Sequence, residues 1–439
     1  MPLRFDISHR SATTRARVGR VTTPHGSFDT PAFMPVGTRG SVKGLFPGMV
    51  AATGAQIILG NTYHLMLRPG SDLIEKLGGL QRFTGWSGPM LTDSGGYQAY
   101  SLAHTNKIND DGVTFKSIVD GAMVTLTPES AMRIQNQLGA DIIMAFDDCP
   151  PSVDPQAAPV NQPRLHEAAH RDALYEPSAQ AEESSPSPSR RPRSKTYDHA
   201  ARLTLANERT IRWLERCKTE HHRLGGHDRR ALFGIVQGGT DLSARTWCAE
   251  RVAAIDLSGY AIGGVAVVEQ SDDIARVVRH TAPLLPEAKL RYLMGVGYER
   301  DLLAAVQSGV DMFDCVLPTR NGRNANAFTP TGQIRLRNAK FADDPLPIQV
   351  GCDCAACAPG PARGMPWASP GDQPFSRAYI RHLFFAEEML GPILVSLHNL
   401  RYFQRFMADL RATVHSDDWK GFADRCPLAR PGMGVQAAS

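Results

Sequence analysis

The sequence has no apolar run long enough to span a membrane, and its first residues, MPLRFDISHR, lack the apolar centre of a signal peptide. These absences predict a soluble, cytoplasmic protein. A strong charge of one sign is also missing, because the net charge is +4 and charged residues make up 21% of the 439. Any nucleic-acid binding must therefore come from a local basic patch.

The eight cysteines do not have the spacing of a disulfide framework, because five are scattered and three stand together. Cys352, Cys354 and Cys357 would place three thiolates on one tight turn. With one histidine they would form a closed tetrahedral zinc site, which is structural because no position is left for water. The sequence predicts reduced thiols and one metal cluster.

His398, in the apolar stretch SLHNL, is the expected fourth ligand, and His382 is an alternative. Two other interpretations stay open from the residues alone. One is a redox pair made by Cys354 and Cys357, and the other is an iron–sulfur cluster completed by Cys426.

Eight short apolar runs recur, each followed by polar or glycine-rich residues, and they are typical of buried parallel strands. They lie at residues 32–36, 56–59, 90–92, 142–146, 232–236, 260–262, 292–294 and 312–317. Helical patterns separate most of them, at residues 127–138, 199–217, 241–255, 271–285 and 299–308. This alternation predicts an α/β fold, a (β/α)8 TIM barrel, with a zinc-binding subdomain.

We expect the barrel over residues 1–336, the zinc-binding subdomain over 337–400, and a C-terminal helix and tail over 401–439. Residues 150–196, rich in Pro, Ala and Ser, are expected to be a disordered insertion. The Pro- and Gly-rich residues 358–374 are expected to form a long loop.

The stretch DMFDCVLPTRNGRNANAF begins as a strand that is interrupted by Asp314, and a buried strand carries a carboxylate chiefly where something binds or reacts. A turn with Arg320 and Arg323 follows. Residues 315–342 contain no Asp or Glu, so this segment suits a polyanion. Asp314 is the first catalytic candidate.

Asp93 follows another strand and precedes two glycines, in LTDSGGYQ. In a barrel, the ends of the strands meet at one mouth, so Asp93 and Asp314 would form a site of two carboxylates. Such a pair is typical of enzymes in which one acid attacks a sugar carbon and the other handles protons. Taken alone, Asp93 also fits a turn or cap former.

A third group of strand ends predicts a pocket that reads a purine-like ring. Asp147 would accept from ring N–H and amino groups, while peptide N–H groups at Gly263 and Gly264 would meet a carbonyl. The expected substrate-binding residues are Ser94, Gly95, Gly96, Tyr97, Asp147, Gln237, Gly263, Gly264 and Met294. Each one alone fits an ordinary core residue, and the prediction depends on their occurring together.

Several motifs together resemble the tRNA-guanine transglycosylases, the queuine tRNA-ribosyltransferase family, over essentially the whole chain apart from the two insertions. They are GNTYHLMLRPG (60–70), LTDSGGYQ (91–98), MAFDDC (144–149), FGIVQGG (233–239), YAIGG (260–264), LMGVG (293–297), MFDCVLPTRNGRN (312–324) and C-x-C-x-x-C. The resemblance implies a TIM barrel with a structural Zn²⁺. It also implies a homodimer that exchanges the wobble guanine of certain tRNAs for a 7-deazaguanine.

By this resemblance, Asp314 matches the nucleophile that attacks ribose C1′ and forms a covalent intermediate, and Asp93 matches the general acid/base. Tyr97 and Met294 match the pair that stacks on the base. The implied zinc ligands are Cys352, Cys354, Cys357 and His398. The implied tRNA contacts are Gly295, Val296, Gly297, Tyr298, Glu299, Arg300, Asp301, Thr319, Arg320, Asn321, Gly322 and Arg323.

The run of residues 263–267 resembles the bacterial type, which takes the small base preQ1, although Val268 stands where that pattern has Gly. Exchange with queuine is therefore an alternative. A second alternative is a barrel glycoside hydrolase that uses Asp93 and Asp314. A catalytically silent RNA-binding subunit is a third, and it is disfavoured because both acids are present.

Overall fold

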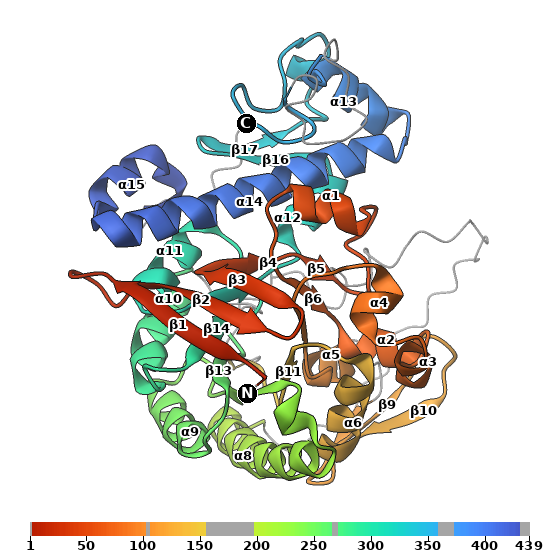
Figure 1. Cartoon of the computed structure of the whole chain (residues 1–439), viewed down its shortest axis with the longest axis vertical. Coiled ribbons are helices and arrows are strands. Elements are labelled where there is room, and N and C mark those ends of the chain that lie inside the picture. The colour runs from red at the N-terminus through yellow and green to blue at the C-terminus, as the bar shows by residue number, and fades with distance from the viewer. Residues whose placement is uncertain (1, 102–105, 155–196, 266–270, 359–372, 431–439) are drawn as a thin grey trace.

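The computed structural model describes residues 2–101, 106–154, 197–265, 271–358 and 373–430 (Figure 1). The expected insertion at 150–196 and the expected loop at 358–374 lie largely outside the described residues. Within these ranges, every helix is too short or too polar to cross a membrane.

A ring of parallel strands lies at the centre, in the order β4-β15-β14-β13-β12-β11-β7-β6-β5. β4 (Ala32–Met34) pairs with β15 (Met312–Asp314), and β5 (Val36–Gly37) pairs with β6 (Ile58–Gly60). Because Pro35 has no N–H to donate, it divides one strand into β4 and β5, and the ring closes through residues 32–37. The predicted α/β barrel is confirmed.

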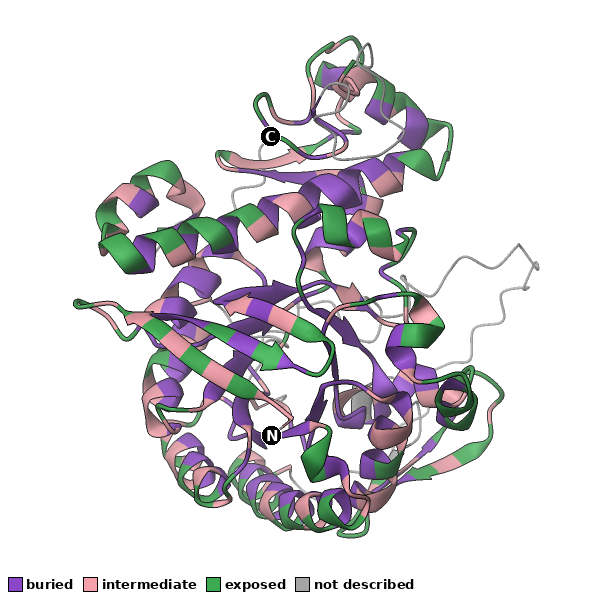
Figure 2. Ribbon diagram, viewed as in Figure 1, coloured by how far each residue is buried: buried purple, intermediate pink, exposed green. Residues whose placement is uncertain are grey.

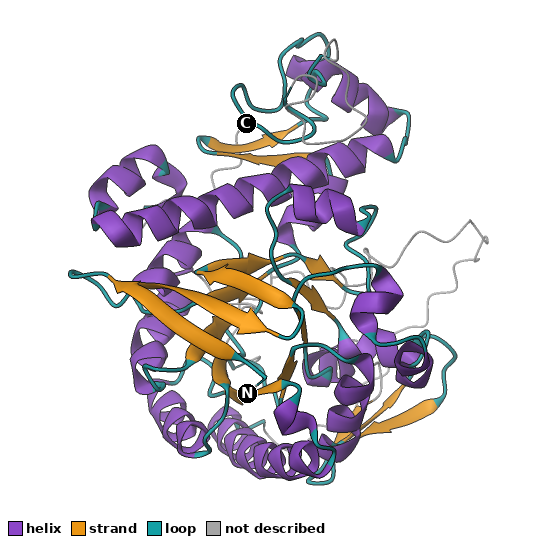
Figure 3. Cartoon of the chain, viewed as in Figure 1, coloured by secondary structure: helices purple, strands orange, loops and turns teal. Residues whose placement is uncertain are grey.

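The other strands of the ring also coincide with predicted apolar runs, and helices surround them (Figure 3). They are β7 (Met90–Thr92), β11 (Ile142–Met144), β12 (Ala231–Val236), β13 (Gly259–Ile262) and β14 (Leu290–Leu293). Alternate side chains face opposite ways. On β14, for example, Tyr292 packs inside the ring and Leu293 packs toward the helices, so both faces of the strands are buried (Figure 2).

The main outer helices are α6 (Pro128–Leu138), α8 (His199–Arg223), α9 (Leu242–Ala254), α10 (Ser271–Thr281) and α11 (Glu299–Gln307). They confirm the predicted helical stretches. α6 begins as its sequence predicts, because Thr127 caps it and Pro128 takes its first position. Short helices fill the loops of the first half, namely α1 (Pro47–Ala52), α2 (Thr62–Leu67), α3 (Ser71–Lys76), α4 (Leu80–Thr84) and α5 (Gly96–Ser101).

An antiparallel sheet of β1 (Arg4–Arg10), β2 (Arg17–Thr23) and β3 (Gly26–Thr30) lies across one end of the ring (Figure 1). Arg17 joins the two, since its guanidinium donates to both carboxylate oxygens of Asp311 at 2.8 and 2.6 Å. Asp311 precedes β15, so this is the end at which the strands begin. The site must therefore lie at the other end.

Three further segments stand outside the barrel. A small sheet contains β8 (Asn106–Ile108), β9 (Val113–Lys116) and β10 (Met123–Leu126), and a hairpin contains β16 (Asn326–Thr329) and β17 (Gly332–Arg335). The C-terminal helices are α13 (Arg377–Phe385), α14 (Leu390–Ser416) and α15 (Trp419–Arg425). α14 is a single helix of 27 residues that crosses the boundary expected at residue 400.

The expectation of a turn after Asp314 is wrong in one respect, because residues 317–323 form a short helix, α12 (Leu317–Arg323). It packs closely on α14. A Cβ atom at Gly322 would lie 2.6 Å from the hydroxyl of Ser396, so glycine is needed at this crossing. Asn399, also on α14, donates to the carbonyl of Pro318 at 2.9 Å.

We predict that Arg17→Met lowers the free energy of unfolding by about 3–5 kcal/mol, because it leaves Asp311 buried without its cation. Both side chains of this pair are 1% exposed or less. Arg20→Met is the matched control, since Arg20 lies on the same strand and makes an exposed ion pair with Asp29. It should change stability by about 1 kcal/mol or less. Equal losses in denaturant unfolding of the two variants would contradict this reading.

Candidate active site

The predicted catalytic and base-reading residues gather where the barrel strands end. Asp93 follows β7, Asp147 follows β11, Gln237 follows β12, Gly263 follows β13, and Asp314 is the last residue of β15. Because all these strands are parallel, these residues share one mouth, opposite the sheet of β1–β3. The arrangement expected from the sequence is therefore present.

Asp93 is a buried carboxylate surrounded by hydrogen-bond donors. Its Oδ1 accepts from the peptide N–H of Thr62 at 2.8 Å, and its Oδ2 accepts from the amides of Asn61 at 2.5 Å and Gln98 at 3.3 Å. Burial raises the pKa of Asp93 to about 7; the Thr62 bond opposes this rise, and the charge of Asp314 adds to it. Asp93 can therefore hold or release a proton near neutral pH.

Asp314 has a more open setting, and it is only partly buried. The hydroxyl of Tyr292 donates to its Oδ1 at 2.6 Å, and the N–H of Gly295 donates to the same oxygen at 2.8 Å. Burial raises the pKa of Asp314 from its ordinary value, while these two bonds oppose the rise. Two donors that favour the ionised form hold one oxygen and orient the other.

Asp147 lies beside Asp93 and is linked to two predicted pocket residues. Ser94 donates to its Oδ1 at 3.1 Å, and the amide of Gln237 donates to its Oδ2 at 2.6 Å. Burial raises its pKa to about 6, against the effect of these bonds. The side-chain oxygen of Gln237 is buried and has no partner among the described residues, so a bound ligand with a donor group would satisfy it.

At two glycines of the pocket, Gly263 and Gly264, any larger residue would place its side chain in the space beside Gln237 and Met294. A Cβ atom at Gly264, whose φ is +62°, would lie 2.3 Å from the oxygen of Gln237. One at Gly263 would lie 3.0 Å from the Gln237 nitrogen and 3.6 Å from the sulfur of Met294. A Cβ atom at Gly96 would lie 3.0 Å from the carbonyl oxygen of Asp147, and Gly96 starts the helix that carries the half-buried Tyr97. Gly95 has φ +76° and turns the chain into this helix.

The residues expected to contact tRNA divide into exposed and buried groups. Gly295 is exposed, and Arg320, Asn321 and Arg323 on α12 are partly exposed. Tyr298 and Arg300 are partly exposed as well, whereas Val296, Gly297, Thr319 and Gly322 are buried.

Glu299 and Asp301 are also buried. This differs from the expectation that they contact tRNA, which requires exposed side chains. Glu299 accepts from the hydroxyl of Tyr402 at 3.0 Å, and Asp301 accepts from the hydroxyl of Ser271. Both carboxylates sit in the first turn of α11, where negative charge favours the helix. They support the loop that follows β14 and present no surface.

Four residues that contact the two acids were not singled out from the sequence: Asn61, Thr62, Gln98 and Tyr292. Three of them lie in the quoted motifs GNTYHLMLRPG and LTDSGGYQ, close to Asp93 in the fold. Tyr292 lies two residues before Met294, so a strand places both side chains on the same face. That alternation is a signal that could have identified it.

Cys352, Cys354, Cys357 and His398 converge in the buried interior of the C-terminal region. The three sulfurs lie 3.7, 3.5 and 3.4 Å from Nδ1 of His398. Ligands at the usual Zn–S and Zn–N distances in a tetrahedron lie about 3.5 Å apart, so this set fits Zn²⁺. Nε2 of His398 pairs with the carbonyl of Phe328 at 2.8 Å, which leaves Nδ1 for the metal.

The choice of His398 over His382 agrees with this geometry, because His382 is not in the cluster. Cys426 is also outside it, which disfavours the four-cysteine iron–sulfur alternative. The identity of the metal as zinc rests on the donor set.

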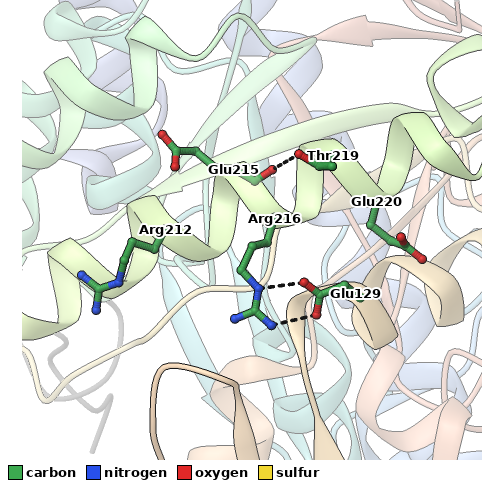
Figure 4. Close-up of a pocket in the computed structure, with 6 residues that line it drawn as sticks. All are labelled: Glu129, Arg212, Glu215, Arg216, Thr219 and Glu220. Atoms are coloured by element: carbon green, nitrogen blue, oxygen red, sulfur yellow. Dashed lines mark hydrogen bonds and ion pairs between the residues drawn. The ribbon is translucent and has the colours of Figure 1, made fainter.

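A groove of about 220 Å³ on the outer surface, between α6 and α8, does not resemble a reaction site. In Figure 4, Arg216 and Glu129 face each other across it, with two bonds of 2.7 and 2.8 Å. Arg212, also in the groove, pairs with Asp110 at 2.8 Å. These charges satisfy one another, and the helices that carry them lie outside the ring.

We predict that Cys354→Ser lowers the metal content of the purified protein and its melting temperature, because a closed metal site contributes folding free energy directly. Elemental analysis and calorimetry on the same sample would measure both. Cys426→Ser is the control, as that thiol is partly buried and lies outside the cluster. A Cys354→Ser protein with full metal content and unchanged melting would contradict the ligand assignment.

Comparison with known proteins identifies the family. The queuine tRNA-ribosyltransferase family profile matches residues 11–171 and 193–431. A queuine tRNA-ribosyltransferase of Thermus thermophilus is 44% identical over 99% of this chain and 96% of its own. One from Stenotrophomonas maltophilia is 44% identical over 98% and 97%, and one from Herpetosiphon aurantiacus is 46% identical over 96% and 91%. The chain therefore belongs to the queuine tRNA-ribosyltransferase family, which is a family of pentosyltransferases.

Proposed function

We propose that the protein replaces the wobble guanine of tRNAs with a GUN anticodon by a 7-deazaguanine base, as a step of queuosine biosynthesis. The observation that carries this proposal is that two carboxyl groups in different environments lie at the same end of the barrel. Asp93 is buried with a pKa near 7, and Asp314 is more open and is held by Tyr292. Family membership supports the same activity.

In the first half-reaction, Asp314 attacks C1′ of the ribose. A bond forms between its carboxylate oxygen and C1′, the C1′–N bond to guanine breaks, and guanine leaves with the bonding electrons and a proton from Asp93. Since Tyr292 and Gly295 both bind Oδ1, Oδ2 is the oxygen that attacks. The product is a covalent tRNA–enzyme ester.

The second half-reaction reverses these steps with the incoming base. Asp93, now ionised, takes the proton from that base, whose nitrogen attacks C1′ and displaces Asp314. Two inversions give net retention at C1′, as in retaining glycosidases, with a base in the place of water. A buried mouth favours this outcome, because water would release the tRNA without a base.

The pocket beside the acids would read the base by its polar edge. Asp147 accepts from the ring N–H and the exocyclic amino group, and the N–H of Gly264 donates to the ring carbonyl. Tyr97 and Met294 would hold the two faces of the ring. The proximity of Gly263 to both Gln237 and Met294 supports this grouping.

The tRNA would lie over α12, where Arg320 and Arg323 are partly exposed and residues 315–342 contain no acid. Phosphate contacts of this kind position the anticodon loop over the acids. Zn²⁺, held by Cys352, Cys354, Cys357 and His398, would have a structural role, because four protein ligands leave no open position.

The protein would act in the cytoplasm as a homodimer. A partly apolar surface where α13 meets α14 supports self-association, since Phe385 is 56% and Met389 is 78% exposed. Phe46, beside α1, is also exposed, and α1 packs on α14. For the base we propose preQ1, on the sequence of residues 263–267; positions 266–268, including Val268, lie outside the described residues.

We predict that the protein incorporates labelled guanine into an unmodified GUN tRNA and that Asp314→Ala removes this activity completely, while tRNA affinity is largely kept. The same tRNA, labelled base and filter assay serve both proteins. An active Asp314→Ala variant would show that Asp314 is not the nucleophile. Absence of label with the unaltered protein, together with cleavage of aryl glycosides, would instead favour the hydrolase.

Addition of unlabelled preQ1 or queuine to this assay distinguishes the two base types. The proposed subtype requires preQ1 to compete at a concentration at which queuine does not. Equal competition by both would contradict the subtype and would leave the exchange reaction itself intact.

We predict that kcat/KM for tRNA falls about tenfold for each pH unit above about 7, because the free enzyme must carry a proton on Asp93 to release guanine. In acid the rate should fall again, as Asp314 must be ionised to attack. Initial rates from pH 5 to pH 9 would measure both limbs. A flat profile between pH 7 and pH 9 would exclude Asp93 as the acid.

A further inference from the structure

Arg245, on α9, is a buried arginine whose contacts lead to the base pocket, although its local sequence does not distinguish it from other helical arginines. Its side chain is 0% exposed. Its guanidinium donates to four backbone carbonyls, which are those of Val236 at 2.9 Å, Gly239 at 2.8 Å, Gly263 at 2.7 Å and Gly264 at 3.1 Å. One side chain thus ties together the loops that follow β12 and β13.

These contacts fix the direction of the peptide N–H of Gly264. In a trans peptide, the C=O of one residue and the N–H of the next point in opposite directions. The C=O of Gly263 points at Nη1 of Arg245, so the N–H of Gly264 points away from the guanidinium. The side chain of Gln237 borders both glycines and that of Met294 borders Gly263, so the Gly263–Gly264 peptide lies beside the pocket residues.

The helix that carries Arg245 also holds the neighbouring loop directly. The thiol of Cys248, one turn further along α9, accepts from the N–H of Gln237 at 3.3 Å. A Cβ atom at Gly238 would lie 2.9 Å from the backbone nitrogen of Arg245, so the loop and the helix are in backbone contact. Helix α9 therefore fixes the positions of the polar groups of both Gln237 and Gly264.

We propose that Arg245 is a positioning residue for base recognition, which orients the N–H of Gly264 toward the carbonyl of the purine ring. This inference rests on the proposed function, since it assumes that Gly264 reads that carbonyl. Arg245 does not touch the base. It acts by holding the Gly263–Gly264 peptide in the one orientation that presents a donor to the ligand.

A lysine at this position would keep the positive charge but not the geometry. Arginine presents five N–H groups in a planar fork, whereas lysine has one ammonium group on a flexible stem. Arg245→Lys would bind one or two of the four carbonyls, and the Gly263–Gly264 peptide would be free to rotate. The loss should fall on the ring carbonyl and leave the contacts of Asp147 with the amino group in place.

The test compares the affinities of three free bases for the full-length protein by calorimetry. Guanine has the ring carbonyl, the ring N1–H and the amino group; 2-aminopurine lacks the carbonyl and the N1–H, and hypoxanthine lacks only the amino group. The loss of the N1–H affects both proteins equally, because Asp147 is unchanged in the variant, so a change in preference between them reports the carbonyl. In Arg245→Lys, the preference for guanine over 2-aminopurine should fall about five- to tenfold, the value of one hydrogen bond. The preference for guanine over hypoxanthine should stay as in the unaltered protein.

Arg291→Lys is the matched control. Arg291 is another buried arginine that donates to backbone carbonyls, those of Leu285 at 2.6 Å and Gly309 at 3.4 Å, but it lies at the opposite end of the barrel. This variant should lose stability and keep both base preferences. If Arg245→Lys does not fold, Arg245→Gln, which keeps a shorter donor, is measured in the same way.

An unchanged preference for guanine over 2-aminopurine, or an equal fall in both preferences, would overturn the proposal. So would failure of both Arg245 variants to fold while Arg291→Lys folds, because the role of Arg245 would then be stability alone. The unaltered protein separates this inference from the proposed function. If it neither exchanges guanine nor prefers it over 2-aminopurine, the function itself fails; if it does both, the variants decide the role of Arg245.

Discussion

Parallel pairing of the backbone around a closed ring decides where the functional groups of this protein lie. Each strand hydrogen-bonds to two neighbours that run in the same direction, so the residues that follow the strands meet at one end. Asp93, Asp147 and Asp314 are distant in the sequence and become neighbours for this reason alone. Closure depends on residues 32–37, which pair with β15 on one side and β6 on the other.

The ring then has to accommodate three carboxylates in a poorly hydrated mouth. Each is supplied with donors, but the donors differ. Asp93 receives a peptide N–H and two amides, Asp147 a hydroxyl and an amide, and Asp314 a phenol and a peptide N–H. Unequal burial and unequal donors separate the proton affinities of like groups, which allows chemically identical side chains to take different roles.

Much of this arrangement is predictable from the sequence. Apolar runs separated by helical patterns predict the barrel, and the polar residues at the ends of these runs predict where the candidate active site lies. Other features depend on contacts between distant segments. Tyr292 reads as a core residue, and its hydroxyl becomes important only because β15 brings Asp314 beside it. α12 reads as a turn because of Pro318 and Gly322, and it becomes helical where α14 packs against it.

The same limit applies to charge. Glu299 and Asp301 lie at the start of a predicted helix and in the set expected to contact tRNA, and their local sequence does not indicate the partners that bury them. Their partners, Tyr402 and Ser271, come from other helices. Arg245 is a similar case, because an arginine within a helix of mixed polar and apolar residues gives no sign that its acceptors are four carbonyls of two other loops.

α14 has a consequence for how the chain can be divided. The helix carries His398 of the metal cluster and, one turn later, Tyr402, which holds Glu299 beside the loop that follows β14. Further along, Gln404 and Arg411 donate to carbonyls of Phe33 and Pro31, at the strand that closes the ring. The metal region and the barrel thus share one continuous helix, so the chain cannot be cut between them without dividing α14. We therefore expect the two regions to unfold together, because a barrel cut free of its metal region would lose the contacts that α14 makes with Phe33 and Pro31.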